Sequence, residues 1–296
     1  MNLRPPCEED ASAMAELMSL GWPEPRSETS VLRALAAPSA DPARNARVAI
    51  SPSGSIVGTA MLDEVGAGRG KFWLDVRAPS TEVAEALVAW AEGRVRERAE
   101  AAARLFAGSW SAGDAVVAAL RSRGFSHVRR SLRMRIDLTG GTPTPVWPDG
   151  ISVRTRAPGD EHAVYEAHME TFADSWEHEA TDYAEWSHWH LDSARYDPSL
   201  SFLAFDGEEL AAIALCREDD AAAGVGWVSI LGVRRPWRER GLGAGLLRHA
   251  FRTFADRGCQ SVVLGVDATS LTGAERLYER VGMSAADRFE IYEQTL

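Results

Sequence analysis

Apolar positions in residues 151–296 switch repeatedly between the two-residue period of a strand and the longer period of a helix. In residues 241–257 the apolar side chains recur about every four positions, which is typical of an amphipathic helix. Short apolar runs at 226–233 and 261–266 are typical of buried strands. The pattern predicts strand, helix, hairpin, strand, helix, strand, helix and strand, at 151–157, 159–172, 201–215, 226–233, 241–257, 261–266, 272–282 and 288–296.

Turn residues sharpen these boundaries and indicate the fold class. Asp206 and Gly207 form the two-residue turn that a hairpin needs, and Gly282 follows the short helix where a helix commonly ends. Hairpins come first and a strand–helix–strand unit follows. We therefore expect an α/β or α+β fold, with a mixed, mostly antiparallel sheet flanked by helices.

Similar segments occur in the same order in the two halves of the chain. LDVRAP at 74–79 resembles LGVRRP at 231–236, 157 positions later. Two more pairs lie 158 and 150 positions apart, namely 120–125 with 278–283 and 3–10 with 153–160. The near-constant separation predicts a duplicated domain. We expect the domains over 1–138 and 151–296, joined by a linker rich in Thr, Pro and Gly over 139–150.

Composition and charge exclude several classes of partner. The net charge of −11 disfavours binding to nucleic-acid backbones and attracts cations. No apolar run is long enough for a membrane helix, and the sequence does not begin with a secretory signal. Cys7, Cys216 and Cys259 show neither disulfide nor metal-ligand spacing. We therefore expect a cytoplasmic protein with no metal site and no membrane partner.

The sequence RERGLGAG at 238–245 lies between the strand that ends near Val233 and the helix that follows. The start of a helix presents unpaired N–H groups and a partial positive charge. Glycines let the backbone approach a ligand closely, and arginines add charge and forked hydrogen bonds. The segment therefore predicts a site for phosphate or pyrophosphate.

Other nucleotide-binding loops are poorer matches to this segment. A Walker loop needs Gly-Lys-Ser/Thr, whereas leucines follow Gly245. A Rossmann turn has its third glycine one position later and follows its strand more tightly, although Asp267 stands where a ribose-binding acid would lie. The remaining alternative is a solvated glycine turn without a ligand.

Arg238, Gly241 and Gly243 resemble the Arg/Gln-x-x-Gly-x-Gly/Ala signature of the GNAT superfamily of acyl-coenzyme A-dependent N-acetyltransferases, and AERLYERVGM at 274–283 is similar to a second family segment. The resemblance implies acetyl-coenzyme A as co-substrate, with its pyrophosphate on the amides of 238–245. The asparagine that the family frequently carries before the second segment is absent here, and Ser270 stands near its position. The implied coenzyme-binding positions are Leu231, Val233, Arg238, Gly241, Gly243, Ala244 and Ser270.

The resemblance also implies a chemistry. Tyr278 matches the tyrosine that protonates the departing thiolate, and a strand N–H near Leu231 or Val233 would polarise the thioester carbonyl. The glutamate that several members carry near the start of the fourth strand falls close to Trp227, which takes no proton. The identity of the general base therefore stays open.

Residues 169–190 follow the first helix, where the family places its substrate-covering element, and combine acidic and aromatic side chains. Aromatic walls with carboxylates suit a cationic amine. The alternative is a solvated pair of helices with the tryptophans packed inward. The candidate substrate residues are Glu170, Asp174, Trp176, Glu177, His178 and Trp227.

The first half lacks these motifs, although 81–106 is expected to form a helix. Thr81, Ala84 and Ala86 stand 157 positions before Arg238, Gly241 and Gly243, and Leu120 stands 158 positions before Tyr278. We therefore expect a degenerate first domain and acetyl transfer to a small-molecule amine by the second. The alternatives are a protein or peptide N-acetyltransferase and a non-catalytic acyl-coenzyme A sensor.

Overall fold

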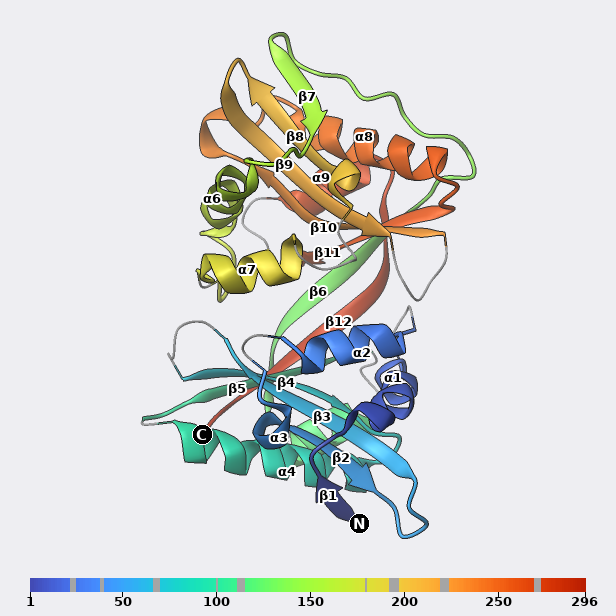
Figure 1. The fold of residues 1–296 in the computed structure, drawn as a ribbon, viewed down its shortest axis with the longest axis vertical. Coiled ribbons are helices and arrows are strands. Elements are labelled where there is room, and N and C mark those ends of the chain that lie inside the picture. The colour runs from blue at the N-terminus through green and yellow to red at the C-terminus, as the bar shows by residue number, and fades with distance from the viewer. Residues whose placement is uncertain are drawn as a thin grey trace. The chain divides into compact units, whose positions relative to one another are not determined.

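A computed structural model describes residues 1–21, 25–37, 40–65, 70–99, 101–110, 115–178, 180–191, 197–218, 224–268 and 273–296 (Figure 1). The chain divides into two compact units. Unit 1 comprises Met1–Ser131 and Asp287–Leu296, and unit 2 comprises Leu132–Ala286. None of the described helices combines the length and apolar character needed to cross a bilayer.

Unit 2 is built on a mixed sheet whose strands follow the order β7-β8-β9-β10-β11-β6. Neighbouring strands from β7 to β10 are antiparallel, and β10 and β11 are parallel. The strands are β6 (Ser126–Asp137), β7 (Ile151–Thr155), β8 (Ser201–Asp206), β9 (Glu209–Glu218), β10 (Val225–Val233) and β11 (Ser261–Asp267). The helices are α6 (Glu161–Phe172), α7 (Tyr183–His190), α8 (Leu242–Asp256) and α9 (Ala274–Arg280), with 3-10 turns η2 (Pro198–Leu200) and η3 (Arg235–Trp237).

Helices cover both faces of this sheet, as the apolar alternation along its strands requires. On one face, Leu246, Ala250 and Phe254 of α8 pack against side chains of β8, β9, β10 and β11. On the other face, Val164 and Ala167 of α6 pack with Trp186 of α7 and with Ile213 and Leu215 of β9. Unit 2 is therefore the mixed, helix-flanked sheet that the sequence predicts.

Unit 1 repeats this plan, with sheet order β1-β2-β3-β4-β5-β12. Its strands are β1 (Asn2–Arg4), β2 (Ala46–Ile50), β3 (Ile56–Glu64), β4 (Lys71–Arg77), β5 (Arg104–Ser109) and β12 (Ser284–Thr295). Its helices are α1 (Ala11–Met18), α2 (Glu28–Leu35), α3 (Pro42–Asn45), α4 (Thr81–Arg98) and α5 (Ala115–Ser122), with the 3-10 turn η1 (Glu8–Asp10). The predicted helix over 81–106 is too long, because residues 104–109 form a buried strand.

The two units do not coincide with the expected domains 1–138 and 151–296. Residues 287–296, at the end of the chain, belong to unit 1, where Glu290–Thr295 pairs with β5. Conversely, Leu132–Leu138 belongs to unit 2, where Leu138 donates its N–H to Gln260. Each unit therefore takes its last strand from the other half of the chain. The spacing of the repeats gives no sign of this exchange, because the apolar pattern of a strand does not identify the strand with which it pairs.

The expected linker is also part of unit 2. Trp147 lies against α8, where its ring contacts His249 at a centroid distance of 6.2 Å. A Cβ at Gly245 would lie only 2.5 Å from the same ring. Composition correctly marks 139–150 as irregular, but the half-buried ring of Trp147 packs this segment against α8.

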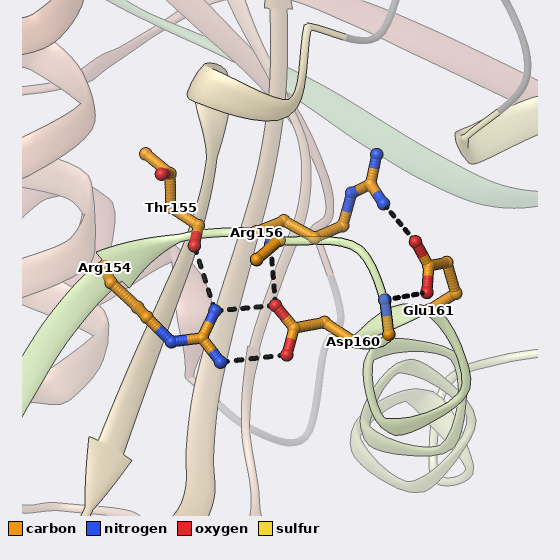
Figure 2. A network of polar contacts seen from close by, with 7 residues as sticks. Arg154, Thr155, Arg156, Asp160 and Glu161 are labelled. Atoms are coloured by element: carbon orange, nitrogen blue, oxygen red, sulfur yellow. Dashed lines mark hydrogen bonds and ion pairs between the residues drawn. The ribbon is translucent and has the colours of Figure 1, made fainter.

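An identical polar contact opens both units and supports the duplication. In unit 2, Arg154 binds both oxygens of Asp160, which also accepts the N–H of Ala157 (Figure 2). In unit 1, Arg4 binds both oxygens of Asp10, which accepts the N–H of Cys7. Each pair fixes the turn between the first strand and the first helix of its unit.

We expect Asp10→Asn and Asp160→Asn each to lower the free energy of unfolding by about 1–2 kcal/mol at pH 7, because each breaks a charge-assisted pair. The bond from Arg4 lowers the pKa of Asp10 to about 2, so its contribution is present above pH ~4 and is lost as the pH falls toward 2. Urea unfolding at pH 7 and pH 3 measures both effects. Asp41→Asn, in an exposed pair 3.7 Å from Arg44, is the control. Equal losses in all three variants would contradict this account.

Candidate active site

A β-bulge in the middle of β10 changes which face of the sheet its side chains occupy. The pairing with β9 shifts register between Val228 and Ile230, so Ser229 is the additional residue. Val228 packs in the cluster on the α8 side, whereas Ile230 packs in the cluster on the α6 side. Beyond the bulge, Leu231 and Val233 return to the α8 side.

The parallel pairing between β10 and β11 ends just before this bulge. Among the described residues it covers only Val225–Trp227 with Ser261–Val263. Arg234 donates its N–H to Ala211 next to β9, and backbone groups along a strand point alternately to its two sides. The N–H groups of Leu231 and Val233 therefore point away from β9, to the side where the ladder with β11 has ended.

The chain leaves this strand through a turn that ends at the start of α8. After η3, Glu239 adopts a φ of 63° and Gly241 a φ of 89°, both in the left-handed region. Gly241 is the residue before the helix, and no side chain caps the first amides of α8. These N–H groups therefore keep their capacity to bind an anion.

The three glycines of the turn have three different reasons to be there. Gly241 supplies the positive φ, and a Cβ there would meet nothing within 4 Å. A Cβ at Gly243 would lie 3.1 Å from Leu277 of α9, so this glycine lets α9 approach the helix start. Gly245 makes room for Trp147. Of these three glycines, only Gly241 faces open space.

Most of the arginines around the turn bind the protein itself, contrary to the expectation that they supply free positive charge. Arg234 binds Glu170 at 2.6 Å, and Arg235 binds Asp174 at 2.9 Å. Arg240 binds Asp206 at 3.1 Å. These pairs anchor the turn to α6 and to the β8–β9 hairpin.

Arg238 differs from these three arginines. Its Nε donates to the carbonyl oxygen of Val233 at 3.2 Å, which orients the guanidinium group. Within the described part of the chain, its terminal nitrogens have no hydrogen-bonding partner. Among these arginines it is therefore the one prepared to bind an anion at the turn.

Tyr278 on α9 lies in the apolar cluster beneath α8, with 8% of its surface exposed. Burial raises its pKa to about 12, so the phenol stays protonated at neutral pH. No described residue hydrogen-bonds its hydroxyl group. A neutral, unpaired phenol is suited to donate a proton or a hydrogen bond.

The candidate substrate residues do not form one group of free acids. Burial favours the neutral form of Glu170, but hydrogen bonds from Arg234 and Arg235 outweigh it and hold its pKa below the usual value. Trp176, Glu177 and His178 follow α6 in a turn, where all three are half-buried. Ser270 lies outside the described residues.

Trp227 lies on the part of β10 before the bulge, between two arginines. The guanidinium groups of Arg217 and Arg133 lie 5.0 and 6.0 Å from the centre of its ring. Arg133 is almost completely buried. These contacts give the tryptophan a packing role at the position where the family resemblance would place a base.

Sequence reasoning missed a hydrogen-bonded pair between α6 and α7. The indole N–H of Trp186 donates to Nδ1 of His168 at 2.7 Å, and His190 lies edge-on to His168 with centroids 5.4 Å apart. Burial, with smaller contributions from His190 and His178, lowers the pKa of His168 to about 3. The one signal in the sequence is a histidine within the predicted helix 159–172. No local pattern identifies its partner on α7.

The described connection of unit 1 that corresponds to residues 234–241 is much shorter. Residues 78–80 connect β4 directly to α4, whereas residues 234–241 connect β10 to α8. Ser80 caps α4 by accepting the N–H of Val83. Leu120, which occupies the position corresponding to Tyr278, is fully buried in the core. The first turn of α4 therefore has a cap of its own where α8 has none.

Comparisons with known proteins identify the family to which the chain belongs. The family model "Acetyltransferase (GNAT) family" matches residues 161–283. A mycothiol acetyltransferase of Catenulispora acidiphila is 30% identical over 82% of this chain and 79% of its own length. The chain spans about half to four fifths of the length of the curated mycothiol acetyltransferases it matches first.

Solved structures resemble the whole chain. A GCN5-related N-acetyltransferase from Sphaerobacter thermophilus has a TM-score of 0.80 and 29% identity, covering 99% of this chain and 95% of its own. A tandem GNAT protein from the clavulanic acid biosynthesis pathway shares the fold, with a TM-score of 0.75 and 16% identity over 99% of this chain and 98% of its own. The chain belongs to the GNAT family of acetyltransferases.

We expect Gly245→Ala to destabilise the protein by about 1–3 kcal/mol, because the new methyl group overlaps the ring of Trp147. The measurement is a double-mutant cycle of unfolding free energies with Trp147→Ala. In the Trp147→Ala background the added methyl group should cost little, so the two changes should not be additive. Additive costs would show that Gly245 is required for a reason other than this contact.

Proposed function

We propose that this protein transfers the acetyl group of acetyl-coenzyme A to the amine of a small molecule, and that unit 2 carries the active site. The observation that carries the proposal is the uncapped start of α8 on Gly241; this helix start lies near Val233, on the part of β10 beyond its pairing with β11. An anion site and two outward-pointing strand amides then lie at the two ends of the segment Leu231–Gly241. A phosphate-bearing thioester needs both.

The residues suit acetyl-coenzyme A, which is the source of the activated acetyl group. Its pyrophosphate would accept hydrogen bonds from the first amides of α8, at Gly243 and Ala244, and from the terminal nitrogens of Arg238. Gly241 leaves open space beside these donors. A side chain there would project into the volume that the phosphates need.

The N–H groups of Leu231 and Val233 would stabilise the thioester carbonyl oxygen as negative charge develops on it. The amine attacks the carbonyl carbon, so that a C–N bond forms and the C–S bond breaks. Tyr278 would donate its phenolic proton to the departing sulfur. The proton that the amine loses passes to water, which also reprotonates Tyr278, because Trp227 offers no base on β10.

One observation supports a small acceptor: the relative from Catenulispora acidiphila that aligns with 82% of this chain is named as a mycothiol acetyltransferase. The charge of the acceptor is a separate question. Arginines neutralise Glu170 and Asp174, so these carboxylates are not free to recognise a cationic group. The acidic net charge is then a property of the whole surface rather than of these two residues.

Replacing Tyr278 with Phe tests the proposal. We expect kcat to fall on the order of 10²-fold, because the thiolate loses its proton donor. The Kd of acetyl-coenzyme A, measured by calorimetry, should change little, since the ring is retained. Tyr292→Phe, which removes the hydroxyl of another buried tyrosine, is the matched control and should leave kcat unchanged. A Tyr278→Phe variant with unchanged kcat, or with an equal loss of coenzyme binding, would remove Tyr278 from the role of acid.

A further inference from the structure

His168 has a fixed tautomer. Its Nδ1 accepts the indole N–H of Trp186 at 2.7 Å, so this nitrogen carries no proton. The neutral ring must then carry its proton on Nε2. The two ring nitrogens point in nearly opposite directions, and Nε2–H therefore points away from Trp186. Among the described residues, no protein group accepts this N–H.

The surroundings of His168 are aromatic and uncharged. Phe172 and His190 lie edge-on to its ring, with centroids at 4.7 and 5.4 Å. Burial lowers the pKa of His190 to about 4, so it is neutral together with His168 above pH ~5. Glu170 on α6 and Asp174 just after this helix bind Arg234 and Arg235. The half-buried edge of His168 thus presents one neutral donor in an apolar setting.

The same helix borders the strand segment of the proposed site. One turn after His168, Thr171 packs so closely against β10 that a Cβ at Gly232 would lie 2.4 Å from its hydroxyl oxygen. That hydroxyl donates to the carbonyl oxygens of Ala167 and His168. Gly232 separates Leu231 from Val233. His168 therefore lies about one helical turn from Thr171, which contacts the strand segment that carries the proposed amides.

We propose that His168 binds the acceptor molecule, donating a hydrogen bond from Nε2 to a neutral oxygen such as a hydroxyl, ether or amide carbonyl, separate from the reacting amine. This inference rests on the proposed function. A neutral N–H donor cannot accept a hydrogen bond from an ammonium group, and it offers no charge to a carboxylate. The α6–α7 side therefore selects acceptors that carry a neutral oxygen near the amine.

The test compares two ring amines that differ by one hydroxyl group, trans-2-aminocyclohexanol and cyclohexylamine. Protein with ¹⁵N-labelled histidine is titrated with each amine, with and without coenzyme A, and the loss of the signal in His168→Gln assigns it. We expect His168 in the Nε2–H form at pH 6 and a shift of its Nε2–H resonance with the aminoalcohol only. The Nδ1–H form, equal shifts with both amines or no shift with either would overturn the proposal.

Variants separate hydrogen bonding from packing. His168→Leu should raise the Kd of the aminoalcohol about three- to tenfold, the value of one neutral hydrogen bond, and leave that of cyclohexylamine unchanged. His168→Gln, which can place an amide N–H near the same point, should lose less. His162→Gln, at the exposed start of α6, is the control. Equal losses for both amines would show a structural role. Failure of the proposed function would appear separately, as absence of acetyl-coenzyme A binding by calorimetry.

Discussion

The bulge at Ser229 is the constraint on which the geometry of the candidate site depends. A regular β10 would keep Val228 and Ile230 on one face of the sheet. The additional residue instead lets the strand bury Val228 under α8 and Ile230 under α6. Pairing with β11 ends at Trp227, immediately before the bulge. The N–H groups of Leu231 and Val233 beyond it therefore point to a side where no described strand pairs with this part of β10.

Close packing holds this arrangement in place. Gly232 admits Thr171 of α6 on one side of β10, and Gly243 admits Leu277 of α9 at the start of α8. Arginines 234, 235 and 240 then join the turn to Glu170, Asp174 and Asp206. Glu170 lies on α6 and not in the turn. Its loss would nevertheless leave the half-buried guanidinium group of Arg234 in the turn without a carboxylate partner. The charged residues around the turn therefore position it, whereas backbone groups and Arg238 face the proposed ligand.

The difference between the two units follows from the length of one connection. Residues 78–80 give α4 a serine cap, so the Ser80 side chain already accepts an N–H group at the start of this helix. Residues 234–241 form a longer path that ends on a glycine without a cap. Duplication has kept the sheet plan and the Arg–Asp contact that opens each unit. Of these two described connections, only that of unit 2 has the form of the proposed anion-binding turn.

Local signals in the sequence predict most helices and strands. They do not predict the contacts between distant segments. The helix predicted at 241–257 begins at Leu242 and ends at Asp256, and the Asp206-Gly207 turn joins β8 to β9. The predicted patterns do not include contacts between residues 18 or more positions apart. Such contacts include the partners of the arginines, the contact between His168 and Trp186 and the exchange of terminal strands. The bulge is invisible because an apolar strand has the same composition with or without an additional residue.

Some expectations depend on the family resemblance rather than on local pattern. Tyr278 and the coenzyme-facing amides were chosen because their positions match a motif, and their chemistry stays a prediction. The structure supplies physical reasons for the choice: a protonated, unpaired phenol and strand amides that point away from β9. It also supplies a reason against Glu170 and Asp174 as free acids, because arginines hold both of them.

Calorimetric titration with acetyl-coenzyme A tests the central claim most directly, on the wild type, Gly241→Ala and Gly241→Trp. A Cβ at Gly241 meets nothing within 4 Å, so alanine adds only the strain of a positive φ, whereas tryptophan fills the open space. The account predicts one site per chain, weakened modestly by alanine and abolished by tryptophan. Absence of binding, two sites per chain, or unchanged binding in Gly241→Trp would contradict it.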